Sequence, residues 1–282
     1  MGGNWAGFDS LSRASDAPGG GVVLLGGGCN PDPNTHDLAS YTALHYTGSA
    51  NKYFCRYFQK TNGTGLFVPS IEIPALRAAG FFYLVPISSP SKALEQMNNQ
   101  AGKDQGTADG RAACLAMVSA LNSGQGLVTP ARTYLYLDVE GDVALSNWYW
   151  EGWAEGVFNF YDATYGSPFF PCAYANPDLS VNYAVRKQTM DYLSYYAGLV
   201  GSPQRCFGLW TQAPNSGSQA DCNNAPPPAY SLAMNYGQLT WHHWQYALET
   251  PGCRSWDACR AWVDNDQSNP TFEMTDYMLR IA

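Results

Sequence analysis

The sequence predicts an α/β fold, organised as a single (β/α)8 TIM-type barrel with long loops at the C-terminal face of the barrel. Short β-rich runs alternate with helical patterns along the chain, which is the order of parallel βα units. Eight candidate strands fit within 282 residues, a usual length for one barrel. The barrel can be irregular, and the alternative is an open doubly wound sheet, whose G-x-G-x-x-G and phosphate-loop motifs this chain lacks. No linker divides the chain, so we expect residues 1–282 to form one domain.

Each predicted strand is a short aromatic or aliphatic run bounded by turn-forming residues. The strands cover residues 5–10, 52–58, 81–87, 133–140, 168–175, 206–212, 241–247 and 262–264. Between them, apolar residues recur at helical spacing. The helices cover residues 36–46, 69–80, 112–121, 146–165 and 183–199. Residues 18–33 and 215–228 are rich in turn-forming residues and are expected to be long loops.

Three local features refine the helices. Ser70 is a candidate cap for the helix that starts beside it. The Gly-containing residues 102–110 are expected to interrupt a helical region that spans residues 91–126. In the helix at 146–165 the large apolar side chains form one stripe, which predicts core packing. The stripe consists of Tyr149, Trp153, Val157, Phe160 and Tyr161.

The most informative strand is the one at residues 133–140. Side chains alternate across a strand, so its two faces have different chemistry. One face carries Tyr134, Tyr136, Asp138 and Glu140, and the other carries Leu135, Leu137 and Val139. The aliphatic face is expected to pack against helices, whereas the face that ends in two carboxylates must meet a polar space.

The composition excludes several classes of function. The net charge is −8, only 13% of residues are charged, and 14% are aromatic. This argues against disorder and against nucleic acid as a partner. Many aromatic residues with few charges suit a neutral sugar, or simply an aromatic core. No apolar run of 18 residues is present, so we expect no membrane span. The oligomeric state is left open.

Eight cysteines are present, and none forms a C-x-x-C pair. We therefore expect no zinc site, and we expect a secreted, extracellular protein with up to four disulfides. Cys253 with Cys259 and Cys206 with Cys222 are the predicted pairs. The competing interpretation is that cysteines on strands, such as Cys55, Cys172 and Cys206, are buried free thiols.

Acidic residues stand at the ends of three predicted strands. They are Asp9, the Asp138 and Glu140 pair, and Asp264. In a parallel barrel the C-terminal ends of the strands gather on one face, so these carboxylates are expected to meet there. Two neighbouring carboxyl groups can divide the acid and base roles that cleavage of a glycosidic bond requires. His242 and His243 are adjacent on one strand and are expected to point to opposite faces.

Six short motifs follow one another along the chain. They are Gly-Phe-Asp at 7–9, Tyr-Leu-Asp-Val-Glu at 136–140, Pro-Cys-Ala-Tyr at 171–174, Gly-Leu-Trp at 208–210, Trp-Gln-Tyr at 244–246 and Val-Asp-Asn at 263–265. In these motifs and their order, the chain resembles the family-25 glycoside hydrolases, the lysozyme-like muramidase barrels. The resemblance implies that Glu140 is the general acid, that Asp138 stabilises the reacting centre, and that Asp9 supports both. It also implies substrate contacts, made by Tyr174, Trp210, Gln245 and Asp264.

A second resemblance concerns the first third of the chain. Residues 54–58, Glu72 and residues 76–80 are similar to bacterial glycoside-hydrolase-like barrels related to family 25. This similarity implies that Arg56 and Glu72 belong to the site region, with Arg56 contacting the substrate.

Three hypotheses for function follow. The first is a secreted glycoside hydrolase, retaining in mechanism, that cleaves a cell-wall or related polysaccharide without a cofactor or metal. The second is a non-catalytic glycan-binding or extracellular structural barrel of the same fold. The third is a metal-dependent hydrolase that uses Asp9, Asp138, Glu140 and a histidine, and it ranks last because H-x-H and H-E-x-x-H spacings are absent.

Overall fold

The protein is described by a computed structural model. It describes residues 6–9, 52–60, 66–78, 80–90, 96–139, 144–177, 179, 182–199, 206–212, 236–247, 264–269 and 274–282. The predicted helix at 36–46 and the two predicted loops lie outside these residues. The strands are β1 (Ala6–Asp9), β2 (Lys52–Lys60), β3 (Tyr83–Ser89), β4 (Leu127–Val128), β5 (Thr133–Asp138), β6 (Phe169–Ala175), β7 (Leu209–Gln212), β8 (Trp241–Ala247), β9 (Asp264–Ser268) and β10 (Leu279–Ile281). The helices are α2 (Pro69–Ala78), α4 (Gln100–Leu121), α5 (Asn147–Phe158) and α6 (Tyr183–Ala197), with a short 3-10 helix η1 (Met274–Asp276).

The strands form one mixed sheet in the order β2-β1-β9-β8-β7-β6-β5-β3-β10-β4, and β2 also pairs with β3. The pairs β1–β2, β2–β3, β3–β5, β5–β6, β6–β7 and β7–β8 are parallel. The last predicted strand differs from expectation. It was placed at residues 262–264 as a further parallel strand, whereas β9 runs antiparallel to both β8 and β1. The α/β class is therefore confirmed, and a regular eightfold βα repeat is not.

Strand β5 has the two faces that its sequence predicts. Leu135, Leu137 and Val139 belong to the larger hydrophobic cluster, which includes residues of α2, α4, α5 and α6. Tyr134 and Tyr136 belong to a second buried cluster on the opposite side of the sheet. We call the first side the helix face and the second the aromatic face.

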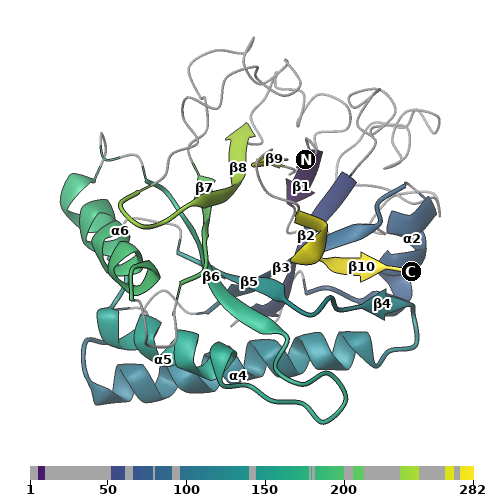
Figure 1. The fold of residues 1–282 in the computed structure, drawn as a ribbon, viewed down its shortest axis with the longest axis horizontal. Helices are drawn as coiled ribbons and strands as arrows, with labels where there is room; N and C mark the ends of the chain where they lie inside the picture. Colours follow the sequence, from purple (N-terminus) through teal and green to yellow (C-terminus); the bar gives the residue numbers. More distant parts are fainter. Residues whose placement is uncertain are drawn as a thin grey trace.

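Helices α4 and α5 lie side by side along the sheet (Figure 1). Helix α4 is continuous over 22 residues, so the predicted interruption at 102–110 is wrong. The glycines there allow a close approach of the two helices. A Cβ atom on Gly106 would lie 2.2 Å from the carbonyl oxygen of Tyr149, and one on Gly152 would lie 1.9 Å from that of Lys103. Glycine is required at these contacts, because any side chain would push the helices apart.

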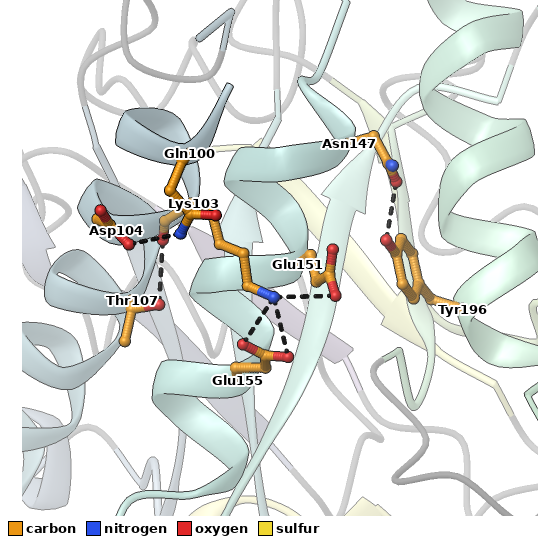
Figure 2. Close-up of polar contacts among 8 residues, drawn as sticks. All are labelled: Gln100, Lys103, Asp104, Thr107, Asn147, Glu151, Glu155 and Tyr196. Atoms are coloured by element: carbon orange, nitrogen blue, oxygen red, sulfur yellow. Dashed lines mark hydrogen bonds and ion pairs between the residues drawn. The ribbon is translucent and has the colours of Figure 1, made fainter. Parts of the chain in front are cut away.

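Polar bonds hold the rim of this contact and tie α5 to α6 (Figure 2). Lys103 Nζ lies 3.1 Å from Glu151 Oε1 and 3.2 Å from Glu155 Oε2. Tyr196 on α6 donates a hydrogen bond of 2.8 Å to Asn147 at the start of α5. The two ion pairs link α4 to α5, and the hydrogen bond links α6 to α5.

The ends of the helices show two departures from prediction. Helix α2 begins at Pro69, so Ser70 lies inside the helix and does not cap it. Glu72 takes the capping role instead, because its Oε1 accepts a hydrogen bond of 2.9 Å from the backbone N–H of Val68. Helix α5 ends at Phe158, and Tyr161, predicted as part of the buried stripe, is 71% exposed. The other members of the stripe are buried as predicted.

The segment at residues 274–282 packs against the aromatic face. Met274 and Met278 are buried within it, and the ring of Tyr277 stacks on that of Tyr134 with centroids 4.3 Å apart. Strand β10 then pairs with β3 and β4. Among the helices that the structure describes, none is both long and apolar enough to cross a membrane.

Candidate functional site

Three of the predicted carboxylate residues lie at one edge of the sheet. Asp9 ends β1 and Asp138 ends β5, and both strands belong to the parallel set. Asp264 begins β9, and its backbone is the register partner of Asp9. Because β9 is antiparallel, its first residue lies where the parallel strands end. The side chains of Asp9 and Asp264, and all of Glu140, lie outside the part of the chain that the structure describes.

Asp138 is the best-defined acidic group of this edge. It is buried, and its Oδ2 accepts two hydrogen bonds from hydroxyl groups on neighbouring strands. Ser89 Oγ, at the end of β3, donates at 2.8 Å. Tyr57 Oη, on β2, donates at 3.4 Å, near the limit for a hydrogen bond. The carboxylate is thus held at the point where β2, β3 and β5 end.

Tyr174 and Trp210 continue the site across the sheet. Asp138 is the register partner of Tyr174 on β6, which is in turn the partner of Trp210 on β7. Both rings are buried, with centroids 4.6 Å apart. Trp210 also meets Tyr136 and His243 edge to face. In this structure the indole is a packed core residue, and its predicted stacking on a sugar would require the ring to become exposed.

His242 and His243 both contact the aromatic face, so the prediction that they point to opposite faces is wrong. The cause is a β-bulge. Trp241 pairs with Leu209 and His243 pairs with Trp210, which leaves His242 as an extra residue on β8. His242 fills the space that Gly208 leaves, because a Cβ there would lie 1.8 Å from its ring.

Each histidine is bonded to a tyrosine. His242 Nδ1 shares a hydrogen bond of 3.2 Å with Tyr136 Oη, and His243 Nδ1 shares one of 3.1 Å with Tyr53 Oη. Burial lowers the pKa of His242 to about 3 and holds the pKa of His243 well below its usual value. Both imidazoles are therefore neutral at pH 7 and serve as packed, hydrogen-bonded groups.

Arg56 lies on the other side of the sheet from the site. Its guanidinium Nε lies 2.7 Å from Glu72 Oε2 on α2, and both side chains are fully buried. The neighbouring residues Cys55 and Tyr57 belong to the aromatic face. The predicted substrate contact of Arg56 is not supported by this placement, because the side chain is committed to a buried ion pair between β2 and α2. Arg56 and Glu72 were both predicted to belong to the site region, and the structure pairs them with each other between β2 and α2.

Gln245 lies on β8 three residues after the bulged His242, and its register partner is Gln212 of β7. Its side chain is outside the described part. The predicted contact of Gln245 with substrate therefore stays a prediction.

Four of the eight cysteines belong to the described residues. No disulfide is found among the described residues, where Cys55, Cys114, Cys172 and Cys206 are all buried. Cys114 and Cys172 are free thiols, as the competing interpretation predicted for Cys172. Burial raises the pKa of Cys172 and raises that of Cys206 to about 12, so neither is a ready nucleophile. The predicted partners Cys222, Cys253 and Cys259 lie outside the described residues, as does Cys29.

Within the described ranges, no group of three or more His, Cys, Asp and Glu side chains is placed to hold a metal ion. The site residues that the structure describes therefore offer hydroxyl, carboxyl and aromatic groups.

Sequence reasoning missed Ser89 and Tyr57. The third strand was predicted to end at residue 87, whereas β3 continues to Ser89. With the correct end, the parallel pairing of Ser88 with Leu137 places Ser89 beside Asp138. For Tyr57, the alternation of β2 was the available signal, since Tyr53, Cys55 and Tyr57 share one face.

Comparisons with known proteins give a similarity in fold. No protein-family model matches the chain, and no curated protein matches it. A solved structure of an uncharacterized protein of B. stearothermophilus is similar over 97% of this chain and 99% of its own, with a TM-score of 0.57 and 16% identity. At that identity the similarity concerns the fold alone.

Two further structures have lower scores. A Tat-secreted protein of Mycobacterium tuberculosis, solved with L-tartrate, has a TM-score of 0.46 and 15% identity over 100% of both chains. The spore cortex lytic enzyme SleM of Clostridium perfringens has a TM-score of 0.44 and 15% identity over 82% of this chain and 63% of its own. Scores of this size carry no argument about function.

Proposed function

We propose that this protein is a secreted glycoside hydrolase that cleaves a cell-wall or related polysaccharide by carboxylate acid/base chemistry. The observation that carries the proposal is the placement of Asp138. A buried carboxyl group, bonded by two hydroxyls, ends a parallel strand at the same sheet edge as Asp9 and Asp264. Glu140 follows Asp138 by two residues in the sequence.

We infer that the sheet forms an irregular barrel. The order of strand pairs supports this inference, because it leads from β1 through β2, β3, β5, β6, β7 and β8 to β9, and β9 pairs with β1. In enzymes built on such barrels, the site lies at the C-terminal ends of the parallel strands. Asp138 lies at that end.

The roles divide among the carboxyl groups. Glu140 protonates the oxygen of the leaving sugar as its bond to the sugar carbon breaks, and the acetamido oxygen of the substrate bonds to that carbon while Asp138 stabilises the positive charge. Water, which gives its proton to the Glu140 carboxylate, then displaces the acetamido oxygen and completes the cleavage. Asp9 supports the pair. Tyr174, which neighbours Asp138 across the β5–β6 pairing, contacts the sugar together with Gln245 and Asp264. Trp210 acts by holding the ring of Tyr174.

The proposed mechanism is retaining. Retention through a direct nucleophile needs carboxyl groups about 5–5.5 Å apart, and inversion needs roughly 6.5–9.5 Å. The anomeric configuration of the first product, followed by NMR, distinguishes the two outcomes. A retained configuration supports the mechanism, and an inverted one replaces it with a water-mediated displacement.

The test is release of reducing ends from a panel of polysaccharides that includes peptidoglycan and chitin-type chains. The parent protein is compared with Glu140→Gln and with the matched control Glu151→Gln on helix α5. We expect release by the parent and the control, and a rate about 10²–10⁴-fold lower for Glu140→Gln. Equal rates for all three proteins would contradict the assigned role of Glu140.

The same panel tests the competing function. Binding to a glycan by the folded parent, with no release of reducing ends from any chain, would replace the hydrolase with a glycan-binding barrel. Secretion is tested separately, by measuring how the chain divides between the medium and the cells of the producing organism.

A further inference from the structure

Two hydroxyl groups meet the same oxygen of Asp138. Ser89 Oγ donates to Asp138 Oδ2 at 2.8 Å, and Tyr57 Oη donates to it at 3.4 Å. In both bonds the hydroxyl group is the donor, so both hydroxyl protons point at this oxygen. The three groups come from three adjacent strands, β2, β3 and β5, and the pairing of these strands brings them together.

All three side chains are buried, with Tyr57 6%, Ser89 7% and Asp138 5% exposed. In such surroundings a hydrogen bond to a charged group is stronger than in water, and it restricts the orientation of the group that accepts it. Rotation of the Asp138 carboxyl group would break both bonds at once. The pair of hydroxyls therefore fixes the plane of the carboxylate as well as its position.

We propose that Ser89 and Tyr57 are positioning residues that hold Asp138 in the orientation used for catalysis. This inference rests on the proposed hydrolase function and extends it to two residues outside the predicted set of carboxylates and sugar contacts. Neither hydroxyl is required to touch the substrate. Ser89 has the larger part, because its bond is the shorter, and Tyr57 the smaller.

The adjacent residue Ser88 supplies a matched control. It is also buried, and its Oγ donates to Gln59 Oε1 at 2.7 Å instead of to Asp138. Ser88→Ala and Ser89→Ala thus each remove one buried hydroxyl and one hydrogen bond from neighbouring positions of β3. A merely structural role would make the two variants alike.

The experiment measures kcat, KM and thermal stability for Ser89→Ala, Ser89→Thr, Tyr57→Phe and Ser88→Ala on the glycan that the parent cleaves. We expect kcat of Ser89→Ala to fall about 10- to 100-fold with KM little changed, as for the loss of a hydrogen bond to a charged group. Ser89→Thr keeps a hydroxyl and should restore most of the rate. Tyr57→Phe should lose less, and Ser88→Ala should keep the parent kcat.

Equal kcat values for Ser89→Ala and Ser88→Ala would overturn the inference while leaving the hydrolase in place. If the parent cleaves no glycan, the proposed function fails on its own, and the positioning is read from the side-chain ¹³Cγ resonance of Asp138. Ser89→Ala should move this resonance and Ser88→Ala should not. An unmoved resonance in Ser89→Ala would also overturn the inference.

Discussion

The two sides of the sheet are both buried, but they are built from different side chains. On the helix face, Leu135 and Leu137 pack with residues of α4 and α5 in a cluster that mixes aliphatic side chains with Phe and Trp rings. On the aromatic face, Tyr134 and Tyr136 pack with tyrosines, histidines and Trp210. A single strand thus contributes an ordinary core on one side and a polar, hydrogen-bonded layer on the other.

This difference indicates what each side is for. Burying hydroxyl and imidazole groups is costly unless each finds a partner, so an aliphatic filling would serve stability better. The aromatic face nevertheless holds two Tyr–His pairs and the bonded carboxylate of Asp138. Departures of this kind from the simplest core are expected at functional sites.

The buried ion pair on the helix face should be structural. Arg56→Met leaves the buried carboxylate of Glu72 without its guanidinium partner, which should lower the free energy of unfolding by about 3–5 kcal/mol. Urea denaturation measures the loss. The control Lys103→Met removes a partly exposed cation that contacts Glu151 and Glu155, and it should cost below about 1 kcal/mol.

Activity measurements distinguish a structural role of Arg56 from a substrate contact. If Arg56 faces only α2, then the folded fraction of Arg56→Met should cleave glycan with the KM of the parent. A large rise in KM, without loss of folding, would instead support the substrate contact that the family resemblance implied.

The contact between α4 and α5 should not accept a methyl group. In Gly152→Ala the new Cβ would lie 1.9 Å from the backbone oxygen of Lys103, so the helices must separate. We expect a loss of about 1–3 kcal/mol in the free energy of unfolding, as for overpacked cores. Gly198→Ala is the control, since its φ is −84° and its nearest neighbour is the flexible side chain of Gln238. A loss in the control as large as in Gly152→Ala would show that helix approach is not the cause.

The aromatic face should weaken as the pH falls below neutrality. The pKa of His242 is lowered from 6.5 to about 3 in the folded protein, so the unfolded chain binds a proton that the folded chain excludes. The free energy of unfolding is therefore not reduced by His242 above about pH 6.5. It declines between that pH and pH 3, by up to about 1.4 kcal/mol per pH unit for such a histidine. His243 acts in the same direction.

Unfolding of the parent and of His242→Gln, measured from pH 7.5 to 5.5, checks this effect. The variant should show a shallower decline, because one buried imidazole no longer titrates. The same slope in both proteins would mean that His242 is not held neutral by burial.

Some of this architecture could be predicted because local patterns decide it. The alternation in residues 133–139 assigns the two faces of β5 correctly, since the strand is buried on both sides. The start of α5 also follows from sequence, because Ser146 accepts a hydrogen bond from the backbone N–H of Tyr149. Residues at helical spacing then place Trp153 and Val157 in the core.

Other features depend on contacts that no local pattern reveals. The glycines of α4 were interpreted as breaks, because their use appears only when α5 lies against them. The bulge that turns His242 inward is a property of the β7–β8 pairing and of the space beside Gly208. Asp264 lies at the predicted edge, although it begins the antiparallel strand β9 instead of ending a parallel strand. Ser89 was missed because the end of β3 was set two residues early.

We propose that one face of β5 carries a catalytic residue and that the other face mainly stabilises the fold. Substitutions of the neighbouring residues Asp138 and Leu137, which lie on opposite faces, test this difference directly. Rates of reducing-end release and free energies of unfolding are measured for the parent, Asp138→Asn and Leu137→Ala. We predict that Asp138→Asn lowers kcat about 10²–10⁴-fold, as expected for loss of a catalytic carboxylate, and that the folded protein persists. Leu137→Ala should lose about 2–5 kcal/mol of stability while its folded molecules keep the parent kcat. An Asp138→Asn variant that keeps the parent kcat, on a glycan that the parent cleaves, would contradict a catalytic role for Asp138.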